Sequence, residues 1–207
     1  VGLSGNDVPQ LLSSFFTQIP QHAYETSHTD GATLIRLSGV LPRFEIVGQT
    51  EIIKTIWQTL KTSCKPVGKP CWEWLEIQAG IPDIVVTTQE EFVPQMVNLD
   101  CLGAINFKKG CYTGQEIVAR THYLGKVKRR TQLAHIATST PPQAGNDVTN
   151  QNNDAVGKIV RSAPAPSGGY DVLAEVRLEA LAEGTVFWNN LALQIQPLPY
   201  SFDAATH

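Results

Sequence analysis

The pattern of apolar and polar positions at the start of the chain predicts a short helix. Asn6 and Asp7 are good helix-capping residues, and Pro9 suits the first helical turn. The apolar residues that follow recur at helical spacing, namely Leu11, Leu12, Phe15 and Phe16. Pro20 then ends any continuation of this helix.

Two strands and a second helix are expected next. Residues 31–37 and 44–47 are short, β-branched and partly alternating runs between Gly and Pro signals, which is typical of strands. Thr50 suits a helix N-cap, and Lys54 and Lys61 lie opposite an apolar stripe. That stripe consists of Ile52, Ile53, Ile56, Trp57 and Leu60.

A loop and a third helix follow. Residues 64–70 (CKPVGKP) are rich in Pro and Gly, which predicts a loop. Trp72, Leu75 and Ala79 then keep a helical spacing. The pattern therefore predicts a short helix that ends before Gly80.

The character of the chain changes near Gly125. From residue 126 onward, short apolar runs are separated by turn-rich stretches such as PPQAGNDVTNQNND and PAPSGG. Turn signals about every ten residues favour a small barrel or sandwich. The sequence therefore predicts an α+β region over residues 1–125 and an all-β region over residues 126–207.

Composition narrows the class of protein. The chain has 207 residues, 42% of them hydrophobic, and a net charge of −3, which excludes a generally basic nucleic-acid coat but not a local basic patch. Its apolar runs are too short for a membrane span, and no signal peptide is visible. Because the chain begins at Val1 rather than Met, we expect that an upstream segment has been removed.

The four cysteines do not have the spacing of a metal knuckle or of a secreted disulfide framework. No two are separated by the two or four residues that bring a pair of sulfurs to one tetrahedral ion. We therefore expect no metal site and reduced thiols in a cytoplasmic protein. The cysteines are Cys64, Cys71, Cys101 and Cys111.

The segment FKKGCYTGQEIVAR, residues 107–120, carries the most chemistry. Gly110 and Gly114 lie on either side of Cys111, so the backbone can turn sharply there and lie close to a ligand. The following GQEIVAR has the composition of a helix opening, with Glu116 in the first turn.

Cys111 is the candidate reactive group of this segment. It precedes a predicted helix N-terminus, and Lys108 and Lys109 are close in sequence. Both features favour the thiolate, which nucleophilic or metal chemistry requires. The alternative is that Cys111 is a small buried hydrophobic residue in a glycine turn.

The motif KGCYTGQE, residues 109–116, resembles the signature of the YgfZ family of folate-binding proteins, relatives of the glycine-cleavage-system T protein. The resemblance extends to WEWLEIQAGIP at 72–82, FVPQMVNLD at 92–100 and IVAR at 117–120. The C-terminal region is similar in pattern to the small β-barrel of that family, with LPY at 198–200. The implied fold is thus an α+β T-protein-like region followed by a C-terminal β-barrel.

This resemblance implies binding of tetrahydrofolate or a one-carbon derivative. It also implies a role in maintaining or assembling iron–sulfur enzymes, notably those that modify tRNA. The family carries about a hundred residues, roughly a small domain, before the part that resembles residues 1–60, and they supply part of the folate pocket. The residues that correspond to the signature are Lys109, Cys111, Tyr112, Gln115 and Glu116.

A folate site needs a stacking surface for the flat pterin ring and a few fixed polar partners. Tyr112 and Trp72 are candidate stacking surfaces, and Gln115, Glu116 or Glu76 are candidate polar partners. Alternatives remain for three of these residues. Trp72 can belong to the core, Glu76 can be a solvated helix residue, and Glu116 can complement its helix dipole.

Basic residues gather around the motif. Seven of the 16 Lys and Arg residues lie between residues 101 and 130, with Glu116 as the only acid there. Such a window can attract a folate tail, a phosphate backbone or an acidic partner protein. For 126–130 (KVKRR) we favour an exposed edge strand protected by charge, and for Lys108 and Lys109 a functional role.

Three functions are consistent with these observations. The leading one is a folate-dependent accessory protein for iron–sulfur enzymes or their assembly proteins, with Cys111 as its reactive group. The second is a folate-dependent aminomethyl or other one-carbon transferase, although the sequence shows no convincing catalytic carboxylate. The third is an RNA-binding or partner-binding module that uses the basic window at 108–130, including direct binding of tRNA.

Overall fold

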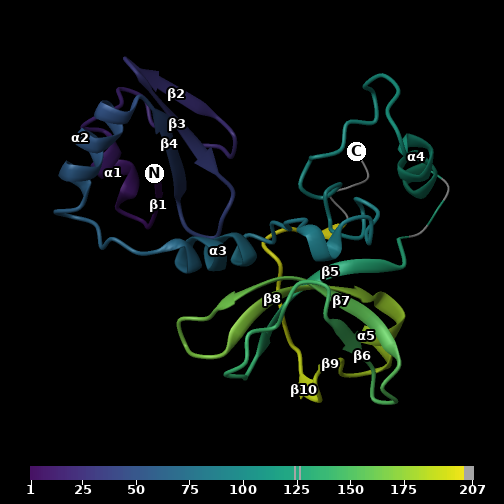
Figure 1. Cartoon of the computed structure of the whole chain (residues 1–207). Helices are drawn as coiled ribbons and strands as arrows, with labels where there is room; N and C mark the ends of the chain where they lie inside the picture. The colour runs from purple at the N-terminus through teal and green to yellow at the C-terminus, as the bar shows by residue number, and fades with distance from the viewer. Residues whose placement is uncertain (124, 126, 203–207) are drawn as a thin grey trace. The chain divides into compact units, whose positions relative to one another are not determined.

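The structure is a computed structural model that describes residues 1–123, 125 and 127–202. The chain forms two compact units, Val1–Trp72 and Glu73–His207, which are described in turn (Figure 1). Within the described residues, no helix combines the length and the apolar character that crossing a membrane requires.

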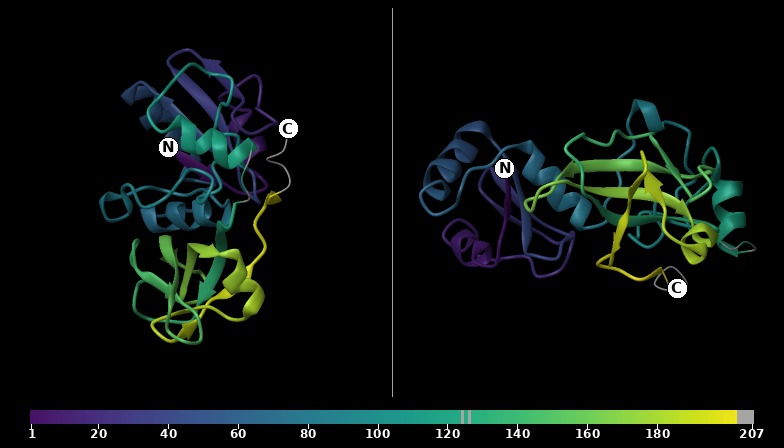
Figure 2. Two further views of the ribbon diagram at one scale, coloured as in Figure 1. Left: turned by 90° about the vertical axis from the view of Figure 1, so that its right-hand side faces the viewer. Right: turned by 90° about the horizontal axis from the view of Figure 1, so that it is seen from below.

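The N-terminal unit is a four-stranded antiparallel sheet with strand order β1-β4-β3-β2. Two helices cover one face of this sheet (Figures 1 and 2). The elements are β1 (Gly2–Ser4), α1 (Val8–Leu12), β2 (Thr26–Thr29), β3 (Ala32–Leu37), β4 (Arg43–Gly48) and α2 (Thr50–Leu60).

The core of this unit lies between the sheet and its helices. Leu12 from α1 and Ile56 from α2 are buried against Leu34 and Ile46, which pair across β3 and β4. The predicted helices and strands are therefore confirmed, with two differences. Helix α1 already ends at Leu12, so the Phe15–Phe16 segment lies beyond it, and Gln49 rather than Thr50 occupies the N-cap of α2.

Helix α3 (Lys69–Gln78) confirms the third predicted helix and begins inside the segment expected to be a loop. Pro70 lies in its first turn, where a missing backbone N–H costs nothing. A 3₁₀ turn, η1 (Val86–Thr88), follows, and α4 (Gln115–Tyr123) begins where the sequence predicted a helix opening.

The C-terminal unit is built on a seven-stranded, nearly closed antiparallel sheet with strand order β10-β9-β6-β7-β8-β5-β11. The α+β class with a C-terminal barrel is thus confirmed, while the domain boundary near Gly125 stays a prediction. The remaining elements are β5 (Arg129–Ile136), β6 (Asp147–Thr149), β7 (Ala155–Pro164), β8 (Tyr170–Arg177), α5 (Leu178–Glu183), β9 (Phe187–Trp188), β10 (Leu191–Ala192) and β11 (Gln194–Gln196).

Strand β5 separates two hydrophobic cores of this unit. Ala134 and Ile136 point into the barrel-like sheet, where they belong to the same cluster as Val172. Leu133 faces the other way and joins Ile77 of α3 in a second cluster. The second cluster ties the segment before α4 to the sheet and so supports the region that carries the KGCYTGQE motif.

Candidate functional site

The KGCYTGQE motif forms an open turn that leads into α4. Gly114 has φ +84°, a left-handed conformation that side-chain-bearing residues rarely adopt, whereas Gly110 lies outside that region. A Cβ atom added to either glycine would meet no other atom within 4 Å. The turn therefore requires glycine at 114 for its conformation, and the space beside its backbone is open.

Gln115 closes this turn with its neighbour Tyr112. The backbone N–H of Tyr112 donates to Oε1 of Gln115 (3.3 Å), and the backbone N–H of Gln115 donates to the carbonyl of Tyr112 (3.2 Å). The second bond satisfies the backbone N–H of the first residue of α4, which has no partner within the helix. Gln115 thus has a structural role at the helix start in addition to any contact with a ligand.

Lys109 and Tyr112, which flank Cys111 in the sequence, contact each other. The Lys109 ammonium sits 4.4 Å from the centre of the Tyr112 ring, a cation–π contact. Cys111 is an exposed free thiol, so the alternative in which it is buried is wrong. Glu116 is exposed in the first turn of α4, where its charge complements the helix dipole.

Trp72 and Glu76 make other contacts. The Trp72 ring packs against Gly2 of β1 and lies 4.6 Å from the guanidinium carbon of Arg43, which supports a packing role. For Glu76 the solvated alternative is wrong, because its carboxylate accepts a hydrogen bond from Arg161 of β7 and is only 24% exposed. Their assignment to a folate pocket stays a prediction.

The structure contains a buried ion pair that the sequence did not reveal. The Arg130 guanidinium donates to both carboxylate oxygens of Asp100, at 2.6 and 2.9 Å. The two side chains are only 7% and 4% exposed. Nη1 of Arg130 also donates to the carbonyl of Gln95 (2.9 Å) and lies 3.6 Å from Sγ of Cys101. Such a two-point pair fixes the positions of both partners.

Gln95 connects this ion pair to α4. Its Nε2 donates to the carbonyl of Val118 in the middle of the helix (2.7 Å), while its own backbone carbonyl accepts from Arg130. Both Gln95 and Val118 are buried. A chain of hydrogen bonds thus runs from Asp100 through Arg130 and Gln95 to the helix that follows the motif.

Asn98 holds the same segment to the sheet and to the C-terminal tyrosine of the LPY sequence. Its Nδ2 donates to the carbonyl of Thr131 (2.8 Å) and lies 3.3 Å from Oη of Tyr200. Tyr200 in turn donates to the carbonyl of Gly80 (2.8 Å). Burial, the largest cause, raises the pKa of Tyr200 to about 12, so the phenol stays a neutral donor.

The expectation of an exposed edge strand at 126–130 is wrong for its two arginines. Arg129 pairs with Arg177 of β8, and its guanidinium is hydrogen-bonded to the carboxylate of Glu175, which raises the pKa of Arg129. Arg130 is the buried partner of Asp100. Lys126 lies outside the described residues. The basic side chains that stay exposed in the window are Lys108, Lys109, Arg120 and Lys128.

Cys101 differs from Cys111 in its surroundings. Burial, followed by the Asp100 charge, raises the pKa of the Cys101 thiol to about 11. The cysteines are free thiols, and within the described part of the chain no three His, Cys, Asp or Glu side chains form a group able to hold a metal ion.

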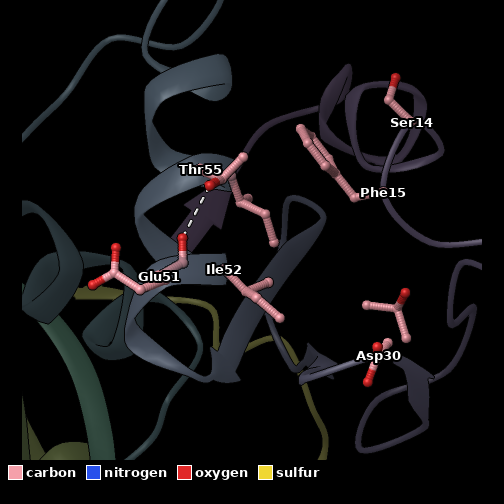
Figure 3. Close-up of a pocket in the computed structure, with 8 residues that line it drawn as sticks. Ser14, Phe15, Asp30, Glu51, Ile52 and Thr55 are labelled. Carbon is pink, nitrogen blue, oxygen red and sulfur yellow. Dashed lines mark hydrogen bonds between the residues drawn. The ribbon is translucent and has the colours of Figure 1, made fainter.

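A separate hollow of about 440 Å³ lies in the N-terminal unit (Figure 3). Phe15 and Ile52 form apolar walls, and Asp30 and Glu51 contribute carboxylates. Thr55 on the same wall donates to the backbone carbonyl of Glu51 (3.0 Å). The two carboxylates would repel the anionic tail of a folate, so we do not favour this hollow for that ligand.

Comparison with known proteins identifies relatives along nearly the whole chain. The tRNA-modifying protein YgfZ of Pectobacterium atrosepticum is 33% identical over 206 residues, which cover 97% of this chain and 62% of that protein. The tRNA-modifying protein YgfZ of Yersinia pestis is 31% identical over 207 residues, with coverage of 97% and 63%. The chain thus spans about three fifths of the length of these relatives. No family model matches the chain.

Among solved structures, the chain resembles the glycine cleavage system aminomethyltransferase T from Bartonella henselae. The TM-score is 0.65 at 17% identity, and the match covers 92% of this chain and 56% of that one. This likeness concerns the fold and agrees with the T-protein-like architecture expected from the sequence. By sequence, the chain is a homologue of the YgfZ proteins over nearly all of its own length.

Proposed function

We propose that the chain binds tetrahydrofolate or a one-carbon derivative at the turn formed by residues 109–116. We further propose that it acts as a cytoplasmic accessory protein for iron–sulfur enzymes, including tRNA-modifying ones. One observation carries the proposal: an open turn presents the Lys109 ammonium, the Tyr112 ring and the exposed Cys111 thiol together.

The residues of this turn fit the chemistry of a folate. Tyr112 offers an aromatic surface for a flat pterin ring, and Lys109 offers a cation for the anionic glutamate tail. Since Lys109 lies over one face of the Tyr112 ring, the ligand would stack on the other face. The open space beside Gly110 and Gly114 leaves room for its approach.

The accessory role rests on Cys111 and on the relatives. Thiolates are the usual protein ligands of iron–sulfur clusters, and the exposed thiol of Cys111 is accessible to a client protein. The homologues carry the name tRNA-modifying protein, which supports clients in tRNA modification. Because the chain spans only part of the length of those homologues, the activity of the whole protein is itself a proposal.

Titration calorimetry with tetrahydrofolate on the full-length protein tests folate binding. We expect Tyr112→Leu and Lys109→Gln each to weaken binding by about tenfold, through loss of stacking and of the cation. Tyr112→Phe, the matched control, keeps the ring and should retain binding. Absence of heat together with absence of protection against thermal unfolding would contradict the proposal.

The iron–sulfur role is tested separately. Cys111→Ala should leave the fold and the stability of the chain unchanged, because the side chain is exposed, while it impairs the activity of a client iron–sulfur enzyme in cells. Unchanged client activity would contradict a role for this thiol. The alternative transferase activity predicts turnover of a methylene-folate substrate, which a binding protein would not show.

A further inference from the structure

Three aromatic rings form a compact group beside the motif. The Phe107 and His122 rings are stacked with centroids 3.9 Å apart and an interplanar angle of 19°. The Tyr123 ring is in a T-shaped arrangement with both, with its centroid 4.7 Å from that of His122 and 6.1 Å from that of Phe107. Tyr123 is nevertheless 67% exposed, so much of its side chain faces solvent.

Exposed cations lie on the same short stretch of chain. Arg120 and Tyr123 are three residues apart on α4, which places them on one face of the helix, and both are exposed. Lys108, next to Phe107, is also exposed. Figure 1 shows that α4 lies away from the barrel-like sheet of its unit.

The charge balance of this stretch opposes that of the whole chain. Among residues 101–123 the only acid is Glu116, although the chain carries a net charge of −3. Arg129 and Arg130 are each paired with a carboxylate, and Arg130 is also buried. Among the described residues of the window, three of the four exposed cations therefore lie on α4 or the loop before it, namely Lys108, Lys109 and Arg120, and the fourth is Lys128.

We propose that this aromatic–basic surface, formed by Phe107, Lys108, Arg120, His122 and Tyr123, binds single-stranded RNA. Unpaired bases stack on aromatic rings, and nearby cations contact the phosphates, which is the combination that single-stranded nucleic acids require. Ile117 is an exposed aliphatic residue on the same helix face, but the other exposed side chains of this surface are the Tyr123 ring and the cations Lys108 and Arg120. This composition differs from the broad apolar patch of a protein-docking site. The surface uses residues outside 109–116, so it is independent of the proposed folate site.

Fluorescence anisotropy with a labelled 12-nucleotide oligo(U) RNA tests this inference. We expect saturable binding to the full chain at low salt, with an affinity that falls as salt rises. Tyr123→Leu keeps an apolar side chain but loses the ring, and should weaken binding by about tenfold. Tyr123→Phe, the matched control, keeps the ring and should bind like the unmodified chain.

Charge variants test whether the cations of this surface contact phosphates. Arg120→Gln should weaken binding and reduce the slope of log affinity against log salt by about 0.7, the value for one phosphate contact on a single strand. Lys61→Gln removes an exposed cation of the N-terminal unit and should change neither quantity. Tetrahydrofolate binding should be retained in Tyr123→Leu and Arg120→Gln, which separates this site from the proposed folate turn.

Three results would overturn the inference. The first is absence of saturable RNA binding, including the case in which the surface binds a protein instead. The second is equal binding of Tyr123→Leu and Tyr123→Phe. The third is equal affinity for inorganic polyphosphate, which has charge but no bases to stack.

Discussion

Two cysteines ten positions apart lie in opposite environments, although both are free thiols. Cys101 is half-buried beside the Asp100–Arg130 ion pair, which is satisfied by further hydrogen bonds. Cys111 is exposed in a turn whose backbone faces open space. The comparison suggests a division of tasks: the buried network fixes the segment, and the exposed turn presents chemistry to a ligand.

The largest effect should come from breaking the buried network. Arg130→Met leaves the Asp100 carboxylate buried without its partner, so the free energy of unfolding should fall by about 3–5 kcal/mol. Urea denaturation of the chain measures this change. Lys54→Met, which removes an exposed ion pair with Glu51, should cost less than about 1 kcal/mol. Equal losses in the two variants would contradict a structural role for the buried pair.

Alkylation should distinguish the two cysteines directly. Because the pKa of Cys101 is raised to about 11, only about one thiol in a thousand is ionised at pH 8. Iodoacetamide should therefore modify Cys101 about a hundredfold more slowly in the folded chain than in urea, as followed by peptide mass spectrometry. Cys111, being exposed, should be modified without unfolding. Rapid modification of Cys101 in the folded chain at pH 8 would contradict the contrast.

The same raised pKa has a consequence for stability. The unfolded chain loses the Cys101 proton at a lower pH than the folded chain does, so this thiol should lower the stability as pH rises from about 9 towards 11. Cys101→Ala should reduce this dependence.

The hydrogen bond from Gln95 links the buried network to α4, and its loss should lower the free energy of unfolding less than loss of the ion pair does. Gln95→Leu removes the donor to the Val118 carbonyl, and we expect a loss of about 1–3 kcal/mol that is concentrated in α4. Hydrogen exchange should speed up in residues 115–123 and remain slow in β7 and β8. Uniform acceleration throughout the unit would mean that Gln95 supports the whole unit rather than α4.

The smallest effect should come from the turn itself. Gly114→Ala places a Cβ on a backbone with φ +84°, and should cost about 1 kcal/mol. Gly110→Ala, in equally open space but outside the left-handed region, should be nearly neutral. Thermal unfolding of both variants measures the difference. An equal cost at the two positions would show that contacts, rather than conformation, require glycine at 114.

Local features of the fold could be predicted from the sequence because they depend on neighbouring residues. The stripe that begins at Ile52 predicted α2, and the glycine turn before Gln115 predicted the start of α4. In contrast, Asp100 and Arg130 are separated by 30 positions, and Glu76 and Arg161 by 85. Local spacing does not indicate such long-range ion pairs. From the sequence, a charged residue in a buried pair therefore cannot be distinguished from a solvated one.

The candidate site also has a part that the sequence predicts and a part that it does not. The motif itself was visible as a run of residues, and the structure brings Lys109, Tyr112 and Gln115 into contact. The supporting residues could not be assigned, because Gln95 reaches Val118 across 23 positions. Trp72, a candidate stacking surface, packs against Gly2 and Arg43, a tertiary contact that its helical spacing does not reveal.

The hydrogen bond from Gln95 to the Val118 carbonyl also affects how α4 can evolve. A bond to the backbone holds the helix whatever side chains it carries, provided that they allow a helix. The outward positions 117, 120 and 123 are therefore free to change with little cost to folding. Selection at these positions can then act on what the helix binds, so this face can diverge between homologues while the scaffold beneath it stays the same.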